Sequence, residues 1–405
     1  MKPVIFTKLS FMMLLEYFIW GAWYVTMSTY MSTHLHATGL QIGAAYSALA
    51  IATMISPFFV GMVADRYFSA QKIMGVLHLI GGVVLYIASI VEGNTIFYFI
   101  VLLYALLYMP TIALSNSVAF SQMTDPGKQF PWIRVFGTAG WIIAGLCIDW
   151  LRIDKTASTF HLAAGASILL GLFSFVLPPT PPKQIATGSA SSALGTEAFV
   201  LFKDKPYLIF FIAAVLVCIP LSFYYEDANL FLTSTGLANV TSKMTLGQIS
   251  EALFILSIPF LFNYIGVKKM LLFGISAWIL RYILFAFGDA GPNVWMLYAG
   301  IILHGICYDF FFVTGYMYTE KKAGGKIKNA AQGLFTFATY GLGMFIGTWF
   351  SGFIKDAYTS KQMVNGAELK SVAWQQVWLV PAYIASAVLL YFIFFFHEKK
   401  EIKHT

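Results

Sequence analysis

The chain has 405 residues, of which 59% are hydrophobic and only 11% are charged. A soluble domain of this size needs more charged surface, and apolar runs of about 18 or more residues recur from end to end, which indicates many transmembrane helices. These runs are continuous rather than alternating, which excludes a transmembrane β-barrel. The net charge of +7 fits basic cytoplasmic loops better than binding to nucleic acid.

We predict an all-α polytopic membrane protein in which twelve transmembrane helices divide into two sets of six. The expected spans are about residues 8–32, 39–64, 72–90, 96–123, 131–152, 158–178, 206–235, 242–263, 268–287, 293–320, 327–353 and 374–396. The first apolar run contains Glu16 and lacks a small-residue cleavage site, so it is interpreted as a membrane helix rather than a cleaved signal. A segment rich in Pro, Ser, Ala and Gly predicts a cytoplasmic linker at 179–205, between six-helix bundles at 1–178 and 206–405.

Basic residues set the predicted orientation of these spans. With both termini inside, eighteen Lys and Arg residues fall on the inner side and six on the outer side, while Arg281 remains within a span. This bias predicts cytoplasmic termini. Cys147, Cys218 and Cys307 all lie in apolar spans without metal-ligand spacing, so we expect no disulfide, no metal and no cofactor.

Acidic residues within the spans are the first functional signal. Asp309 lies near the middle of the run at 301–320, beside His304 and Tyr308, which share a helical face through their i, i+4 spacing. A carboxylate in hydrocarbon is costly, so it should face the bundle interior or a water-filled cavity. Glu16 shares a face with Trp20 and Trp23, where it could relay protons or pair with a nearby base.

The two halves of the chain also resemble each other, as expected of a two-domain transporter with a central cavity. The turn after the second span contains Gly61, Asp65 and Arg66 in the segment GMVADR, which resembles the loop signature of the major facilitator superfamily. The resemblance implies a 6+6 superfamily fold, with these three residues acting in gating rather than as substrate ligands.

A closer resemblance covers essentially the whole chain. Its motifs are WGAW at 20–23, YMPTIALSN at 108–116, FPWIRVFGT at 130–138, LGQISE at 246–251, HGICYDFF at 304–311 and AQG at 331–333. By these motifs the chain resembles the nucleoside:H⁺ symporter family. That resemblance implies proton-coupled nucleoside uptake across a bacterial cytoplasmic (inner) membrane, by alternating access and without enzymatic activity. The implied partners are a nucleoside, a proton and the lipid bilayer, with no nucleic acid, and the functional unit is a monomer.

The resemblance also implies a set of substrate-binding residues. Carried over by position, they are Arg134, Thr138, Trp141, Gln248, Glu251, Tyr308 and Asp309. The chain departs from the better-known nucleoside permeases of the family at Ser222, Tyr225 and His304, which would line the same cavity. The first three carried-over residues share a helical stripe, the polar ones can bind ribose hydroxyls, and an aromatic ring can stack on a nucleobase.

Coupling to protons requires an acid that changes charge as the cavity switches sides. Burial disfavours a carboxylate and a neighbouring cation favours it, so hydration on one side can trigger proton release. Glu251 and Asp309 are the leading candidates, with Glu16 as a third. The departures keep open proton-coupled symport of a sugar or sugar derivative. An enzyme acting on lipid-linked substrates is disfavoured, because the acids lie at mid-depth without a nucleophile–base pair.

Overall fold

The computed structural model describes residues 2–59, 68–181, 196–364 and 367–397. The predicted gating residues Gly61, Asp65 and Arg66 lie outside the described residues, as does most of the predicted linker.

Seven helices precede the linker. They are α1 (Pro3–Trp23), α2 (Met27–Thr33), α3 (Gly39–Phe59), α4 (Ala70–Ile90), α5 (Asn94–Ser121), α6 (Pro126–Leu151) and α7 (Ser158–Ser174). Two of them, α1 and α6, start with a proline in the first turn, where its missing N–H costs no intrahelical bond. In α6, Pro126 follows Asp125, whose carboxylate accepts the Lys128 N–H at 3.3 Å and caps the helix.

The second half is more segmented. A short 3₁₀ helix, η2 (Thr196–Lys203), precedes α9 (Lys205–Ser234), α10 (Val240–Ile255), α11 (Ile258–Ile265), α12 (Val267–Phe287), α13 (Val294–Ile302) and α14 (His304–Tyr308). There follow the π-helix η3 (Asp309–Val313), α15 (Thr314–Thr336), the π-helix η4 (Phe337–Gly343), α16 (Met344–Ala357), β1 (Thr359–Val364), β2 (Ala367–Val372) and α17 (Trp374–Phe395). Non-helical dihedral angles at Gly324 and Ile327 break α15 in two.

Ten helical stretches of the described chain are long and apolar enough to cross a membrane. The other two predicted spans correspond to α7, which has 17 residues, and to the pair α10 and α11, interrupted near Ser257. In the bilayer a helix satisfies its own backbone hydrogen bonds, which is why such apolar runs fold this way. The all-α prediction missed one element, since β1 and β2 pair as an antiparallel hairpin between α16 and α17.

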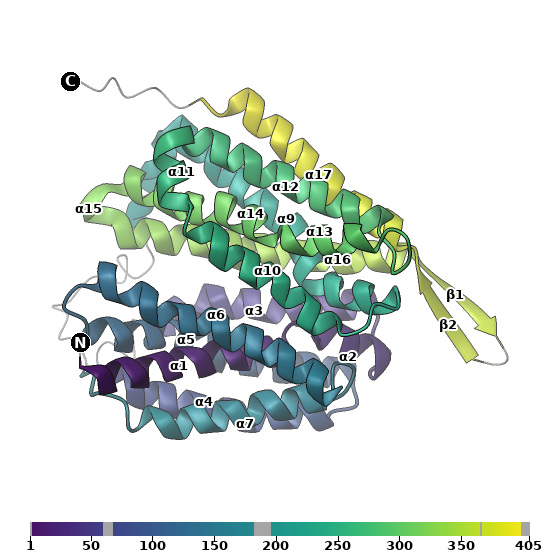
Figure 1. Cartoon of the computed structure of the whole chain (residues 1–405), viewed down its shortest axis with the longest axis horizontal. Coiled ribbons are helices and arrows are strands. Elements are labelled where there is room, and N and C mark those ends of the chain that lie inside the picture. Colours follow the sequence, from purple (N-terminus) through teal and green to yellow (C-terminus); the bar gives the residue numbers. More distant parts are fainter. Residues whose placement is uncertain (1, 60–67, 182–195, 365–366, 398–405) are drawn as a thin grey trace.

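Figure 1 shows α1–α7 gathered in one bundle and α9–α17 in another, with the hairpin projecting at one end. One hydrophobic core draws on residues between Leu9 and Leu177, and a second is built mainly from residues between Ala198 and Phe396. The bundles meet where α3 packs on α16 and α6 packs on α10. At Gly43 an added Cβ would overlap the backbone carbonyl of Thr348, so the absence of a side chain permits this close approach.

Candidate functional site: a cavity between the two bundles

A cavity of about 580 Å³ lies between the bundles and is lined by both of them. Eight of the ten predicted substrate residues line it: Arg134, Thr138, Trp141, Tyr225, Gln248, Glu251, His304 and Tyr308. Its volume is in the range of small-molecule sites, which combine apolar walls with a few convergent polar groups.

The wall from the first half is a stripe of α6 packed on α1. The Arg134 guanidinium carbon lies 4.0 Å above the ring centroid of Tyr17, which fixes the cation by a cation–π contact. Two turns further along α6, Trp141 meets Trp20 edge to face with 5.6 Å between ring centroids. Gly140 lets α6 approach α1 closely, because a Cβ there would overlap the Leu14 backbone. The result is one cation and two indole rings at one wall.

The opposite wall carries the acid. Glu251 projects from α10, and its side chain is 28% exposed, the carboxylate lying 3.7 Å from Nε2 of the buried His304. Tyr225 of α9 and Tyr308 of α14 flank His304, with ring centroids 6.3 and 5.8 Å away. This wall therefore combines a carboxylate, an imidazole and two phenol rings.

Several lining residues were not predicted, notably Tyr17, Tyr24 and Tyr340. Tyr340 of η4 donates a hydrogen bond to the Tyr308 hydroxyl at 2.5 Å. Trp20 also lines the cavity, and its buried indole N–H has no hydrogen-bond partner among the described residues. A polar donor left unpaired beside a cavity is suited to a solute acceptor.

The face of α1 that lines the cavity differs from the one we expected. The lining stripe is Tyr17, Trp20 and Tyr24, spaced i, i+3 and i+7, whereas Glu16 and Trp23 are fully buried inside the first bundle. Glu16 lies 3.0 Å from His78 Nε2 and accepts a hydrogen bond from Thr111 at 2.6 Å. Of the two interpretations of Glu16, the geometry matches pairing with a nearby base.

Two predicted substrate residues are absent from the described lining. Ser222 is fully buried and donates to the Cys218 carbonyl at 2.8 Å. Asp309 begins the π-helix η3 and is fully buried, and neither of its carboxylate oxygens has a hydrogen-bond partner among the described residues. π-Helical turns are rare and concentrate at functional sites. Asp309 is thus a buried acid next in sequence to the lining residue Tyr308.

At one end of the cavity the bundles are joined by hydrogen bonds. The Asp356 carboxylate accepts the backbone N–H groups of Gly39 at 2.5 Å and of Leu40 at 2.9 Å. Nearby, Thr29 donates to the Asn229 side chain at 2.6 Å. Asp356 thus binds the N-terminus of a helix from the other bundle, where negative charge is favoured.

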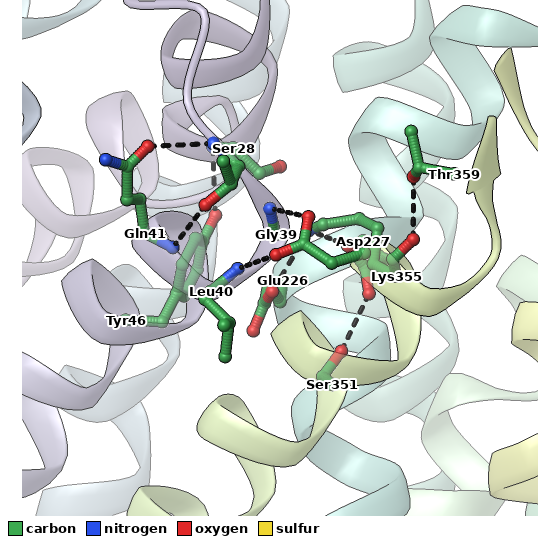
Figure 2. Close-up of polar contacts among 12 residues, drawn as sticks. Ser28, Gly39, Leu40, Gln41, Tyr46, Glu226, Asp227, Ser351, Lys355 and Thr359 are labelled. Atoms are coloured by element: carbon green, nitrogen blue, oxygen red, sulfur yellow. Dashed lines mark hydrogen bonds and ion pairs between the residues drawn. The ribbon is translucent and has the colours of Figure 1, made fainter. Parts of the chain in front are cut away.

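Behind this contact lies a buried ionic cluster (Figure 2). The Lys355 ammonium lies 3.0 Å from Glu226 and 2.5 Å from Asp227, and Ser351 donates to Asp227 at 2.7 Å. The count of basic residues in the sequence analysis included Lys355 among the six on the outer side, in a loop after the span predicted at 327–353. That assignment was wrong, because α16 continues to Ala357 and the two acids of α9 hold Lys355 inside the bundle.

Comparisons with known proteins identify the architecture. The family model described as "Nucleoside H+ symporter" matches residues 4–401. The chain belongs to the nucleoside H⁺ symporter family. Among relatives of this symporter, the putative nucleoside transporter YegT of Escherichia coli is 41% identical over 96% of this chain and 93% of its own. The xanthosine permease of E. coli is 36% identical over 98% of both chains. A crystal structure of a mutant of the nucleoside transporter NupG superposes with a TM-score of 0.90 at 33% identity, covering 97% of this chain and 100% of that one.

Family and fold together establish what the symporter does in general terms. It is a multi-pass membrane protein with the major facilitator superfamily fold, and it carries out proton-coupled nucleoside transport rather than enzymatic catalysis. The predictions of fold, family and transport function are therefore confirmed.

Proposed function

We propose that the cavity is the nucleoside-binding site and that the symporter uses it for uptake across the bacterial inner membrane. The observation that supports this most is the convergence of eight predicted residues from both bundles on one cavity. Arg134, Gln248 and Glu251 offer donors and acceptors to ribose hydroxyls and base edges. Trp141, Tyr225 and Tyr308 offer aromatic faces, and stacking of a base on such a face contributes roughly 1–3 kcal/mol.

We infer that the bundles are in a state closed at the outer end, the end at which Asp356 joins them. This assignment combines the Asp356 contact, which joins the bundles at one end, with the positive-inside orientation, which puts both termini in the cytoplasm. Uptake then requires the bundles at 1–178 and 206–405 to rock about the cavity while the linker at 179–205 connects them. Since one chain supplies both walls, the monomer is the functional unit.

Proton coupling is assigned to Glu251 and Asp309. Glu251 touches the cavity, and its partly exposed carboxylate can exchange a proton with solvent or respond to a solute. Asp309 is buried without a hydrogen-bond partner among the described residues, so the neutral acid suits its surroundings. Movement of η3 during rocking would hydrate Asp309 and release its proton. Glu16 is assigned a structural role as the partner of His78 and no role in proton coupling.

Substrate-dependent thermal stabilisation of the purified protein tests the binding site. Nucleosides, free bases and sugars are added in parallel, because a ligand that binds only the folded state raises the melting temperature. Stabilisation by one or more nucleosides, reduced in Arg134→Ala and Trp141→Ala, is expected. Stabilisation by sugars alone would overturn the nucleoside assignment, and undiminished stabilisation in both variants would overturn the assignment of the cavity.

A further inference from the structure

Arg281 is a buried cation that the transport mechanism above does not use. It lies in α12, is fully buried, and its guanidinium carbon is 3.3 Å from the ring centroid of Tyr224. Its Nη1 lies 3.1 Å from Nδ1 of His304, while its Nε and Nη2 have no hydrogen-bond partner among the described residues. His304 therefore supplies a hydrogen-bond acceptor to this buried cation.

The chemistry of that bond fixes the proton on His304. A guanidinium has only donors and stays charged, so Nδ1 of His304 must accept and carries no proton. A neutral imidazole then carries its single proton on Nε2. Adding a second proton at Nδ1 would direct an N–H at the guanidinium and break the bond, so His304 stays neutral while the bond is formed.

The protonated nitrogen faces the acid of the cavity. Nε2 lies 3.7 Å from a Glu251 oxygen, beyond the usual length of a direct hydrogen bond. The other titratable groups packed around the imidazole are Tyr224, stacked at 5.0 Å between centroids, and Tyr225 and Tyr308 at its sides. The Nε2–H donor and the Glu251 acceptor thus lie side by side in the cavity wall.

We propose that Arg281 is a positioning residue that holds His304 as the neutral Nε2–H tautomer, so that His304 donates a hydrogen bond to an acceptor atom of the bound nucleoside. The adjacent Glu251 accepts from a donor of the same solute. This inference rests on the proposed site and deepens it. It also separates two roles, since His304 supplies a fixed donor while Glu251 is the member of the pair whose charge changes.

The tautomer can be measured directly. Full-length protein labelled with ¹⁵N-histidine is reconstituted in lipid, and the His304 signals are identified by their loss in His304→Gln. We expect a proton on Nε2 alone, unchanged over about pH 5 to 8, the range in which an unperturbed histidine changes charge. A proton on Nδ1, an even mixture of tautomers, or charging within this range would overturn the proposal.

A substitution tests the cause. In Arg281→Gln the His304 spectrum should show a mixture of tautomers or become pH-dependent, whereas Arg281→Lys should retain part of the wild-type spectrum because it keeps one charged donor. An unchanged spectrum in Arg281→Gln would also overturn the role of Arg281. If Arg281→Gln does not fold, the spectra of the wild-type protein and of Arg281→Lys still test whether Arg281 sets the tautomer of His304.

Transport kinetics provide the functional readout. His304→Phe removes the donor and should raise the nucleoside KM roughly three- to tenfold, while His304→Gln, whose amide also donates, should restore much of the loss. His161→Gln is the matched control, because His161 lies on α7 and bonds Ser89 away from the cavity. Equal KM values for the Phe and Gln variants would contradict a donor role. Failure of the wild-type protein to bind nucleosides would instead refute the proposed function, leaving the tautomer measurement intact.

Discussion

Gly43 of α3 lies so close to Thr348 of α16 that no side chain fits between them. Gly43→Val should therefore separate the two helices and shift the equilibrium toward the state open at this end. Spin labels at Ser32 and Ser234, which face a smaller pocket of about 480 Å³ at this end, would report longer distances. Gly165→Val is the control, since a Cβ at Gly165 meets only open space within 4 Å. Identical distance distributions in both variants would show that the contact does not hold the state closed.

Loss of the Asp356 carboxylate should act in the same direction. Charge-assisted bonds to buried or half-buried N–H groups contribute about 1–3 kcal/mol, so Asp356→Ala should favour opening at this end by roughly 5- to 150-fold. Asp356→Asn retains one acceptor and should have a smaller effect. The same pair of spin labels measures both variants. A distance distribution in Asp356→Ala that matches the wild type would refute this role.

Removing the cation from the buried ionic cluster should destabilise the fold. Lys355→Met leaves Glu226 and Asp227 without their cation, which typically costs about 3–5 kcal/mol for a buried pair. Adding Asp227→Asn should recover part of this loss. Thermal unfolding of the purified protein measures the effect, with Lys128→Met as control, because the Lys128–Asp125 pair is exposed and contributes little. Melting temperatures that fall equally in both single variants would argue against the cluster as a stabilising element.

Neutral substitutions of the two candidate coupling acids should abolish nucleoside accumulation but leave nucleoside exchange intact. Glu251→Gln and Asp309→Asn mimic the protonated state, so both should lose concentrative uptake driven by a proton gradient while retaining counterflow of labelled nucleoside. Glu320→Gln provides a control, since that acid pairs with Lys328 at the surface. Reconstituted liposomes with an imposed pH gradient give both readouts. Accumulation against a gradient by both variants would remove these acids from the coupling mechanism.

The indole of Trp141 should contribute to binding through stacking. Trp141→Ala is expected to weaken nucleoside affinity by roughly 5- to 150-fold, which corresponds to about 1–3 kcal/mol. Trp150→Ala on the same helix is a matched control, because that side chain is 83% exposed. Equilibrium binding of a nucleoside to the purified variants measures both affinities. Equal affinities would mean that the solute does not contact Trp141.

The sequence was most informative where its signals were local and strong. Long apolar runs marked most of the helices, and the spacing of Arg134, Thr138 and Trp141 correctly placed them on one stripe of α6. The hairpin was missed although Asn365 and Gly366 separate its two strand sequences, a dipeptide favoured in tight hairpins.

The errors arose where tertiary contacts decide the orientation of a helix. Periodicity puts Glu16 and Trp20 on one face of α1, yet the structure turns Glu16 toward His78 and Thr111 and leaves Trp20 at the cavity. Similarly, no local sequence pattern predicts that Lys355 is buried by ion pairs with acids about 130 residues away in sequence. These partners become visible only once the helices are assembled.

The contact made by Asp356 with α3 has an implication for mutational surveys of this protein. Its partner at Leu40 is an amide of the main chain, which every residue except proline supplies. Alanine at position 40 would therefore leave this hydrogen bond intact and make the position look dispensable. At position 40 a proline, which lacks the amide hydrogen, would break this bond and reveal its part in holding this end of the cavity shut.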